Sequence, residues 1–309
     1  MDKNNIIFAI YACIFIGLIT YIYHVENNKK SKNNILIKNN NNDSNDVFNN
    51  LNYKINNNNF IINRSNDIEF NHILHKTKRK LQEYHPNIVL ITSKIIVSTN
   101  VFSYISTRSI YTTETRFKQT IETIESIRKN IPNACIFLID DSNFETNFVY
   151  MHTKLHELCD VFINPLHDKD LHYYTNVNKY KSIAEGYQII YFLDIFTQLN
   201  IKFDRFFKIS GRYYINKTFN FNNYINDDMI FSLYEDKVYY TCFYMISHNK
   251  FNLYRNAYNV FYLNKNDDIF VELSVEISLP YLLKYNNIKL IKNLGITKRL
   301  SINDNINDI

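Results

Sequence analysis

Two arginines and two aspartates stand where this chain could bind a phosphate-bearing ligand. Arg108 and Arg116 lie between a predicted strand and the helix after it, and their guanidinium groups could clamp a diphosphate through paired hydrogen bonds. Asp140 and Asp141 follow the next predicted strand. Carboxylates at such a position accept hydrogen bonds from a ribose or a base, or hold a divalent cation.

Each pair also has a purely structural explanation. Arg108 could be solvated, and Arg116 could pair with Glu114 or Glu122 on its own predicted helix. The two aspartates could form a turn and cap the helix that begins after them. The sequence leaves these explanations open beside the functional ones.

A third cluster is the segment KISGRY, which follows a later predicted strand. Here Gly211, one of only four glycines in the chain, stands between two cations. Glycine lets a ligand approach the backbone closely, while Lys208 and Arg212 could balance the charge of a phosphate leaving group. The alternative is a bulged strand with exposed cations.

Glu272 and Glu276 are candidates for proton transfer. They lie four residues apart on a predicted helix and so share one face, and either could act as a general base with a raised pKa. A solvated helix face explains them equally well. Lys181, Ser182 and Glu185 form a similar, weaker cluster on another predicted helix.

Apolar residues recur with the periods of strands and helices in turn, and these patterns predict the elements that position the candidate residues. Strands are expected at 88–98, 134–139, 161–164, 205–209, 229–233, 237–247 and 288–291, and helices at 113–130, 147–158, 177–199, 249–262 and 268–285. This alternation is typical of an α/β fold with a mostly parallel, Rossmann-like sheet flanked by helices. Ligands bind outside the carboxyl ends of such strands, where the candidates fall.

The N-terminal part of the chain differs in composition from the rest. Residues 6–23 are uncharged and apolar, which predicts a transmembrane helix and a single-pass membrane protein. Tyr21 and Tyr23 resemble an interfacial belt and favour an uncleaved signal-anchor, whose orientation the flanking charges leave open. We therefore expect a membrane anchor at 1–25, a low-complexity, Asn-rich flexible stalk at 26–83 with a short helix near its end, and an α/β domain at 84–309.

Composition narrows the class of protein. The chain has 25 Tyr and 23 Phe against 4 Gly and no Trp, which indicates an A/T-rich coding sequence of the kind found in some large DNA viruses and protists. The net charge is only +5, and the basic residues do not form the clustered stripe that is typical of a nucleic-acid binder. No nucleic-acid partner is therefore expected. The spacing of cysteine and histidine suits no zinc site.

The chain resembles a GT-A-type glycosyltransferase, specifically the little-characterised bacterial and viral branch of that family. The resemblance rests on Thr92–Lys94 and on the segments RSIYTTETRFKQT, LIDDSN, KISGRY and VEISLPYLLKY. It implies a membrane-anchored enzyme that transfers a sugar from a nucleotide-sugar donor to a glycan, protein or lipid acceptor. It also implies that Asp140 and Asp141 contact the nucleoside and that Glu276 or Glu272 is the catalytic base.

The chain departs from the family at one motif. Members usually carry Asp-x-Asp where KISGRY stands, and that motif binds Mn²⁺ or Mg²⁺ together with the diphosphate. The resemblance therefore does not establish a metal requirement, and Lys208 and Arg212 are candidates to replace the metal. The alternative function is a non-catalytic, membrane-tethered binding or structural module on the same fold.

Overall fold

The computed structural model describes most of the chain from residue 64 onward. The described residues are 64, 66–100, 107–145, 147–178, 181–226, 228–235, 238–263, 275, 279, 282, 283, 288–299 and 306–309. The predicted membrane segment at 6–23 lies outside them, and so do Glu272 and Glu276. In the part that is described, no helix is both long enough and apolar enough to cross a membrane.

Seven strands form the main sheet, in the order β10-β6-β9-β4-β1-β2-β3. Their bounds are β1 (Tyr84–Ser93), β2 (Ala134–Asp140), β3 (Val161–Ile163), β4 (Lys202–Ser210), β6 (Met229–Phe231), β9 (Phe243–Ser247) and β10 (Ile288–Leu290). β1 pairs in parallel with both β2 and β4, whereas β9 runs antiparallel to β4 and β6. The predicted α/β sheet is thus confirmed as a mixed, mostly parallel one.

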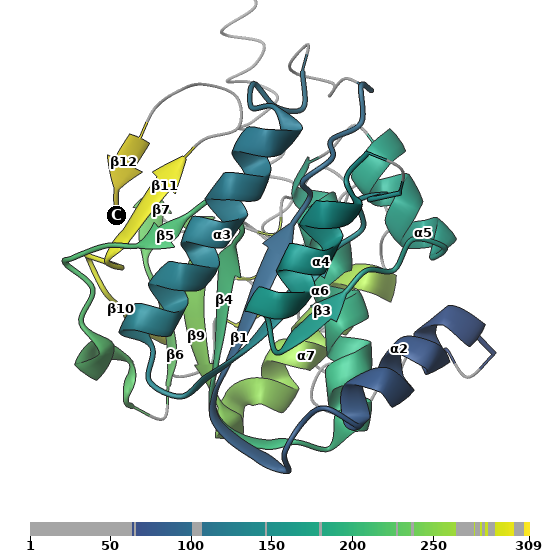
Figure 1. The fold of residues 1–309 in the computed structure, drawn as a ribbon. Coiled ribbons are helices and arrows are strands. Elements are labelled where there is room, and N and C mark those ends of the chain that lie inside the picture. The colour runs from purple at the N-terminus through teal and green to yellow at the C-terminus, as the bar shows by residue number, and fades with distance from the viewer. Residues whose placement is uncertain are drawn as a thin grey trace, which may run out of the picture. The chain divides into compact units, whose positions relative to one another are not determined.

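Helices cover both faces of this sheet. They are α2 (Ile68–Lys78), α3 (Thr113–Asn130), α4 (Val149–Leu158), α5 (Lys169–His172), a π-helical turn (Tyr173–Val177), α6 (Lys181–Leu199) and α7 (His248–Leu263). Figure 1 shows α3 and α4 on one side of the sheet and α6 and α7 on the other. The bounds of α3 agree with the prediction because Thr112 caps its first turn, accepting from Thr115 N at 3.2 Å, and Pro132 follows its end.

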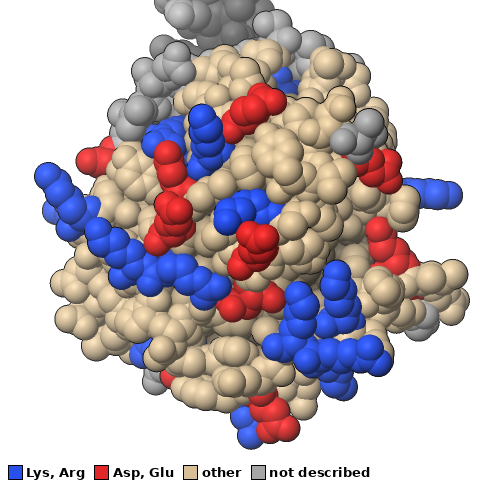
Figure 2. Space-filling view, in the orientation of Figure 1, with Lys and Arg blue, Asp and Glu red and all other residues tan. Residues whose placement is uncertain are grey.

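Short strands complete the fold. A three-stranded sheet contains β5 (Tyr214–Ile215), β11 (Ile296–Arg299) and β12 (Ile306–Asp308), and a two-stranded ribbon contains β7 (Leu233–Glu235) and β8 (Val238–Tyr239). On the face of the molecule drawn in Figure 2, basic and acidic side chains are interspersed, and the basic ones gather most densely over the region of α2 and α4.

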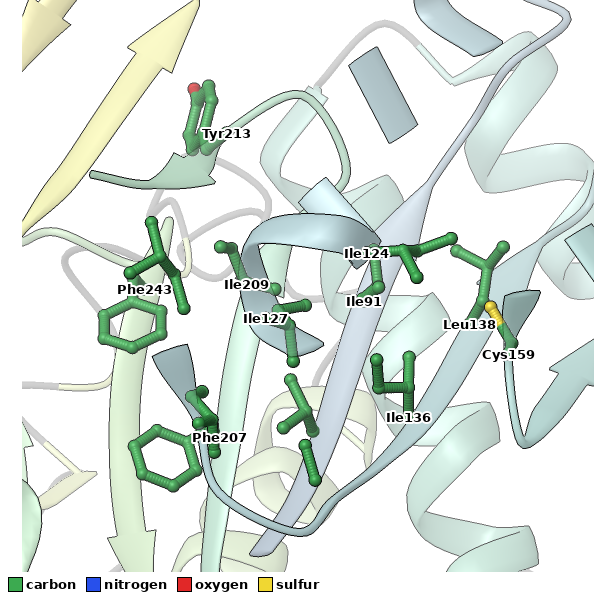
Figure 3. Close-up of a cluster of buried hydrophobic side chains, with 14 of the residues drawn as sticks. Ile91, Ile124, Ile127, Ile136, Leu138, Cys159, Phe207, Ile209, Tyr213 and Phe243 are labelled. Carbon is green, nitrogen blue, oxygen red and sulfur yellow. The ribbon is translucent and has the colours of Figure 1, made fainter. Parts of the chain in front are cut away.

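Alternating strand residues build a core on each face of the sheet. On one face, Val89 and Ile91 of β1 pack with Ile124 and Ile127 of α3, and all four are fully buried or nearly so (Figure 3). Burying each such side chain contributes roughly 1.5–3 kcal/mol. This layer fixes α3, and with it the residues at the helix N-terminus, relative to the ends of β1 and β4.

On the other face, aromatic rings from α6 meet those of the strands. Phe192 stacks on Phe206 of β4 at 5.7 Å between ring centroids, and Phe137 of β2 meets Phe192 and Phe196 edge-on at 5.3 and 5.7 Å. Such ring pairs are worth about 0.5–1.5 kcal/mol each beyond the area they bury. They hold α6 firmly against the sheet, so its first turns keep a fixed position at the carboxyl ends of the strands.

Helix α2 belongs to the folded body although it lies upstream of residue 84, where the sequence predicts the α/β domain to begin. Phe70 of α2 meets Tyr191 of α6 edge-on, with ring centroids 5.6 Å apart. Before the helix, Arg64 bonds Asp194 of α6 at 2.8 Å and also pairs with Asp168. The side chains of both aspartates are almost inaccessible, at 5% and 6% exposure, so this cation neutralises two buried carboxylates.

We predict that Arg64→Ala lowers the free energy of unfolding by about 3–5 kcal/mol near pH 8, because it leaves two buried carboxylates without a counter-charge. Burial raises the pKa of Asp194 to about 6, and Arg64 opposes that rise. Loss of Arg64 raises the pKa further, so the variant takes up a proton at a higher pH than the wild type. The cost of the substitution therefore shrinks as the pH falls from 8 toward 5.

Denaturant unfolding at several pH values measures this cost. Arg79→Ala is the matched control, since Arg79 is an exposed arginine next to the other end of α2. An Arg64→Ala variant no less stable than Arg79→Ala at pH 8 would contradict the assignment of Arg64 as a structural clamp.

Candidate functional site

The carboxyl ends of β1, β2 and β4 bring the predicted site residues to one edge of the sheet. These strands end at Ser93, Asp140 and Ser210, and β1 lies between the other two. The strand order changes direction between β1 and β4, since β2 and β3 follow on one side and β4 lies on the other. In open α/β sheets, ligands bind beside such a switch point.

An ion pair between β4 and α6 lies at the centre of this edge. Lys208 is completely buried, and its ammonium group donates to Glu185 Oε1 at 2.5 Å, to Ser210 Oγ at 3.0 Å and to the Thr241 carbonyl at 2.6 Å. An ammonium group has three N–H donors, so all of them are used. Lys208 is therefore a structural cation and is not free to neutralise a diphosphate.

Glu185 receives three hydrogen bonds on one oxygen. Besides Lys208, the hydroxyl groups of Thr92 and Ser210 donate to its Oε1, each at 2.8 Å. Burial alone would raise the pKa of Glu185, but the Lys208 charge and these hydrogen bonds lower it to about 2. The carboxylate is thus ionised at neutral pH and is a poor proton acceptor.

A second ion pair joins β2 to the residues after β1. Lys94 donates to Asp141 Oδ2 at 2.9 Å and to its carbonyl at 3.1 Å. Thr175 also donates to Oδ2, and Gln188 of α6 donates to Oδ1 at 3.3 Å. Because Asp141 is only 3% exposed, its carboxylate connects three segments of the chain.

Asp140 has an internal role as well. Its carboxylate accepts from the backbone of Ile95 at 2.9 Å and of Ser142 at 2.8 Å, and the residue is fully buried. Burial raises its pKa, and the bonds from Ser142 oppose that rise. Asp140 therefore shapes the two loops that border the site and presents no free oxygen to solvent.

The two arginines predicted to form a clamp have different surroundings. Arg108 is 6% exposed and donates to the backbone carbonyls of Asn100 at 2.7 Å and Thr175 at 3.0 Å, and also to that of Asn178. Its guanidinium group holds the loop after β1 against the π-helical turn. We accordingly assign Arg108 to the framework of the site.

Arg116 is buried beside a second guanidinium group, that of Arg212. It is 5% exposed and donates only to the Lys94 carbonyl at 2.7 Å and to Ser109 Oγ at 3.1 Å. Burial, and next the positive charge of Arg212, lower the pKa of Arg116 to about 9. Among the described residues no carboxylate forms an ion pair with either arginine, and Arg212 Nε is buried without a hydrogen-bond partner.

Gly211 is required by packing between strands rather than by contact with a ligand. Its N–H donates to the Thr92 carbonyl at 2.8 Å, and its carbonyl accepts from Thr120 at 3.0 Å. A Cβ atom here would lie 2.9 Å from Ser93 Cβ. The expectation that this glycine admits a ligand to the backbone is thus replaced by a contact between the ends of β4 and β1.

The structure brings seven of the nine predicted site residues to one edge, and the other two, Glu272 and Glu276, lie outside the described residues. The strongest interactions also involve Lys94 and Glu185. In the sequence, Glu185 belongs to a weaker cluster and Lys94 only to the segment Thr92–Lys94, because nothing in the sequence shows which carboxylate each cation contacts. No group of three or more His, Cys, Asp or Glu side chains within the described ranges is arranged to hold a metal ion.

No protein-family model and no curated protein sequence matches the chain. Among solved structures, it is similar to a nucleoside-diphosphate-sugar pyrophosphorylase from Vibrio cholerae RC9, with a TM-score of 0.40 and 11% identity over 68% of this chain and 93% of that one. The likeness concerns the arrangement of sheet and helices, and no residue's role is transferred from it.

Two glycosyltransferases are similar to the chain at a comparable level. The apo form of GlyE from Streptococcus pneumoniae TIGR4 has a TM-score of 0.37 and 10% identity over 67% of this chain, which spans 45% of GlyE. The PaToxG glycosyltransferase has a TM-score of 0.33 and 14% identity, with 70% of this chain and 75% of that one covered.

We predict that Glu185→Gln lowers the free energy of unfolding by about 3–5 kcal/mol at neutral pH, because it leaves the buried Lys208 ammonium without its counter-charge. The folded-state pKa of Glu185 lies below its ordinary value of 4.5, so its stabilising effect is present above pH 4.5 and is lost as the pH falls toward 2. The free energies of unfolding of the wild type and the variant should therefore become more similar as the pH falls into the acid range.

Chemical denaturation between pH 3 and pH 7 tests this prediction. Glu157→Gln is the control, since Glu157 forms an exposed pair with Lys154 and its loss should matter little. If the difference in free energy of unfolding between Glu185→Gln and the wild type stays constant down to pH 3, the ion pair is not the source of that difference.

Proposed function

We propose that this chain is a transferase that binds a nucleoside-diphosphate sugar at the carboxyl ends of β1, β2 and β4. One observation carries the proposal. The charge of Arg212 acts on the almost completely buried Arg116, and no described carboxylate forms an ion pair with either arginine, although the nearby Asp140 charge partly offsets that of Arg116. A buried charge without a counter-ion is costly, and an anion bound between the two arginines would remove that cost.

A diphosphate suits this pair of cations. A guanidinium group has five N–H donors, and Arg116 makes two hydrogen bonds with the residues that the structure describes. Planar guanidinium groups bind two phosphate oxygens at once, and a diphosphate offers oxygens to both arginines. The motif resemblance in the sequence supports the same class of ligand.

In the proposed reaction, the bond between the anomeric carbon and the diphosphate oxygen breaks while an acceptor oxygen bonds to that carbon. Arg116 and Arg212 stabilise the negative charge that develops on the departing diphosphate. The proton of the acceptor hydroxyl goes to a general base, for which Glu276 and Glu272 remain the candidates from the sequence. Glu185 is excluded from this role by its ion pair with Lys208 and its low pKa.

A divalent cation does not fit the polar groups described at this edge. Each available carboxylate is already engaged, Glu185 by Lys208, Asp141 by Lys94 and Asp140 by backbone N–H groups. We therefore derive no step through Mn²⁺ or Mg²⁺ and assign charge neutralisation to the two arginines. Membrane attachment through residues 6–23 and the nature of the acceptor stay predictions from the sequence.

We predict that nucleoside diphosphates and nucleotide-sugars raise the Tm of the full chain in a nonionic detergent, because they bind the native state alone. Arg212→Ala should remove most of this stabilisation and abolish sugar transfer while the variant remains folded. Lys118→Ala is the matched control, because Lys118 is an exposed cation two residues from Arg116 on α3. It should behave like the wild type.

The outcomes separate the two functions that the sequence leaves open. Binding that depends on Arg212, together with turnover of a nucleotide-sugar, supports the transferase. Binding that depends on Arg212 without any turnover would favour a non-catalytic binding module. If no nucleotide changes the Tm, or if Arg212→Ala and the wild type respond alike, the proposed site is wrong.

A further inference from the structure

A groove lies between α2 and α4, beside the outer edge of strand β3. It has a volume of about 190 Å³, and Val161 and Phe162 of β3 contribute to its apolar lining together with Ile73 of α2. Among the described strands, β3 is the last of the main sheet on this side, and none of them pairs with its outer edge. The groove thus has walls from two helices and a floor from the sheet.

Both walls carry nitrogen-bearing side chains at four-residue spacing. On α2 and just beyond its end these are His72, Lys76 and Lys80, and on α4 they are His152 and His156. Residues four apart on a helix share one face, so the two rows face each other across the groove. In Figure 2, basic side chains are densest over this region of the surface.

The two histidines of α4 are held in place by aromatic contacts. Their rings lie 4.7 Å apart, and Phe162 contacts them at 5.3 Å from His152 and 5.1 Å from His156, measured between ring centroids. Rings packed in this way keep their nitrogens in fixed positions. The imidazoles are therefore preorganised, whereas most surface histidines turn freely.

The electrostatics of the groove favour an anion. Glu69 is the one acidic side chain among the described residues that line it, and its carboxylate already accepts from the His167 backbone at 3.0 Å. Burial first, and then the charges of Lys76, His152 and Lys80 in that order, together lower the pKa of His156 to about 4. Burial and Lys76 also lower the pKa of His152. Bound negative charge would favour the protonated imidazoles and so oppose these downward shifts of pKa.

We propose that the groove between α2 and α4 binds a small phosphorylated molecule, with its phosphate held by Lys76, Lys80 and the two histidines of α4. A phosphate group carries close to two negative charges and three strong acceptor oxygens, which match several donors converging from two walls. The apolar floor of β3 then packs against the organic part of the ligand. The volume suits a small molecule rather than a folded partner.

This site is separate from the pair Arg116 and Arg212, so it can be tested without assuming that the chain is a transferase. The probe is inorganic phosphate, titrated into the full chain in a nonionic detergent at constant ionic strength, with NMR of the imidazole nitrogens as the readout. Phosphate should raise the pKa of His156 from about 4 and that of His152 in parallel. Sodium chloride at the same ionic strength should not.

Amino-acid substitutions test whether the effect of phosphate on the two histidines arises in this groove. Lys76→Ala should raise the pKa of both histidines in the absence of phosphate, since Lys76 lowers both, and should weaken phosphate binding roughly tenfold. Lys154→Ala is the control, because Lys154 is an exposed cation on α4 whose ammonium group pairs with Glu157. It should leave both quantities unchanged.

Two results would overturn the proposal. The first is that saturating phosphate moves neither histidine signal. The second is that Lys76→Ala and the wild type respond equally, which would place the phosphate elsewhere. Because Lys76 is exposed and alanine favours helices, failure of the variant to fold is not a concern. Binding to anionic lipid vesicles without a response to phosphate would likewise count against a soluble ligand.

Discussion

The buried ammonium group of Lys208 sets the geometry of the whole carboxyl edge. Lys208 stands on the central strand β4 between apolar neighbours and is fully withdrawn from water, so each of its three protons needs an acceptor within the protein. Glu185 on α6, Ser210 on β4 and the Thr241 carbonyl supply them, and Thr92 of β1 bonds the same carboxylate oxygen. Two strands, a helix and a loop are joined through one charge.

Much of the fold follows from patterns that lie close together in the sequence. The apolar periodicity and caps around Thr113–Asn130 predict α3 at both ends, and the apolar run after Pro132 predicts β2 within one residue. The direction of β9 could not be predicted with the same certainty as its existence, because a buried apolar strand has the same composition whichever way it runs. The sequence does not predict that helix α2 packs on the folded domain, because Phe70 contacts Tyr191, which lies more than a hundred residues further along the chain.

The gathering of candidate residues at one edge was predictable, but the role of each charged group was not, because pairing between distant residues decides it. The rule that ligands bind at the carboxyl ends of strands selects seven described residues that lie at one edge of the sheet, and their role in binding stays a prediction. Arg108 and Arg116 look equivalent in sequence, yet Arg108 donates to three backbone carbonyls whereas the charge of Arg212 acts on Arg116. The role of Glu185 could not be predicted from the sequence, because its partners Thr92 and Lys208 lie on strands that are remote from it in the chain.

Cations in this protein therefore fall into two groups with different physical origins. Those whose charge is neutralised or whose donors are saturated inside the fold, such as Lys208 and Arg64, are framework, and removing them costs stability. The second group comprises Arg116 and Arg212 at the sheet edge, which form no ion pair with a described carboxylate, and Lys76 in the groove beside α4, whose charge lowers the pKa of two neighbouring histidines. An anion that binds at either place would offset these unfavourable interactions with positive charge, and the energy recovered would contribute to its affinity.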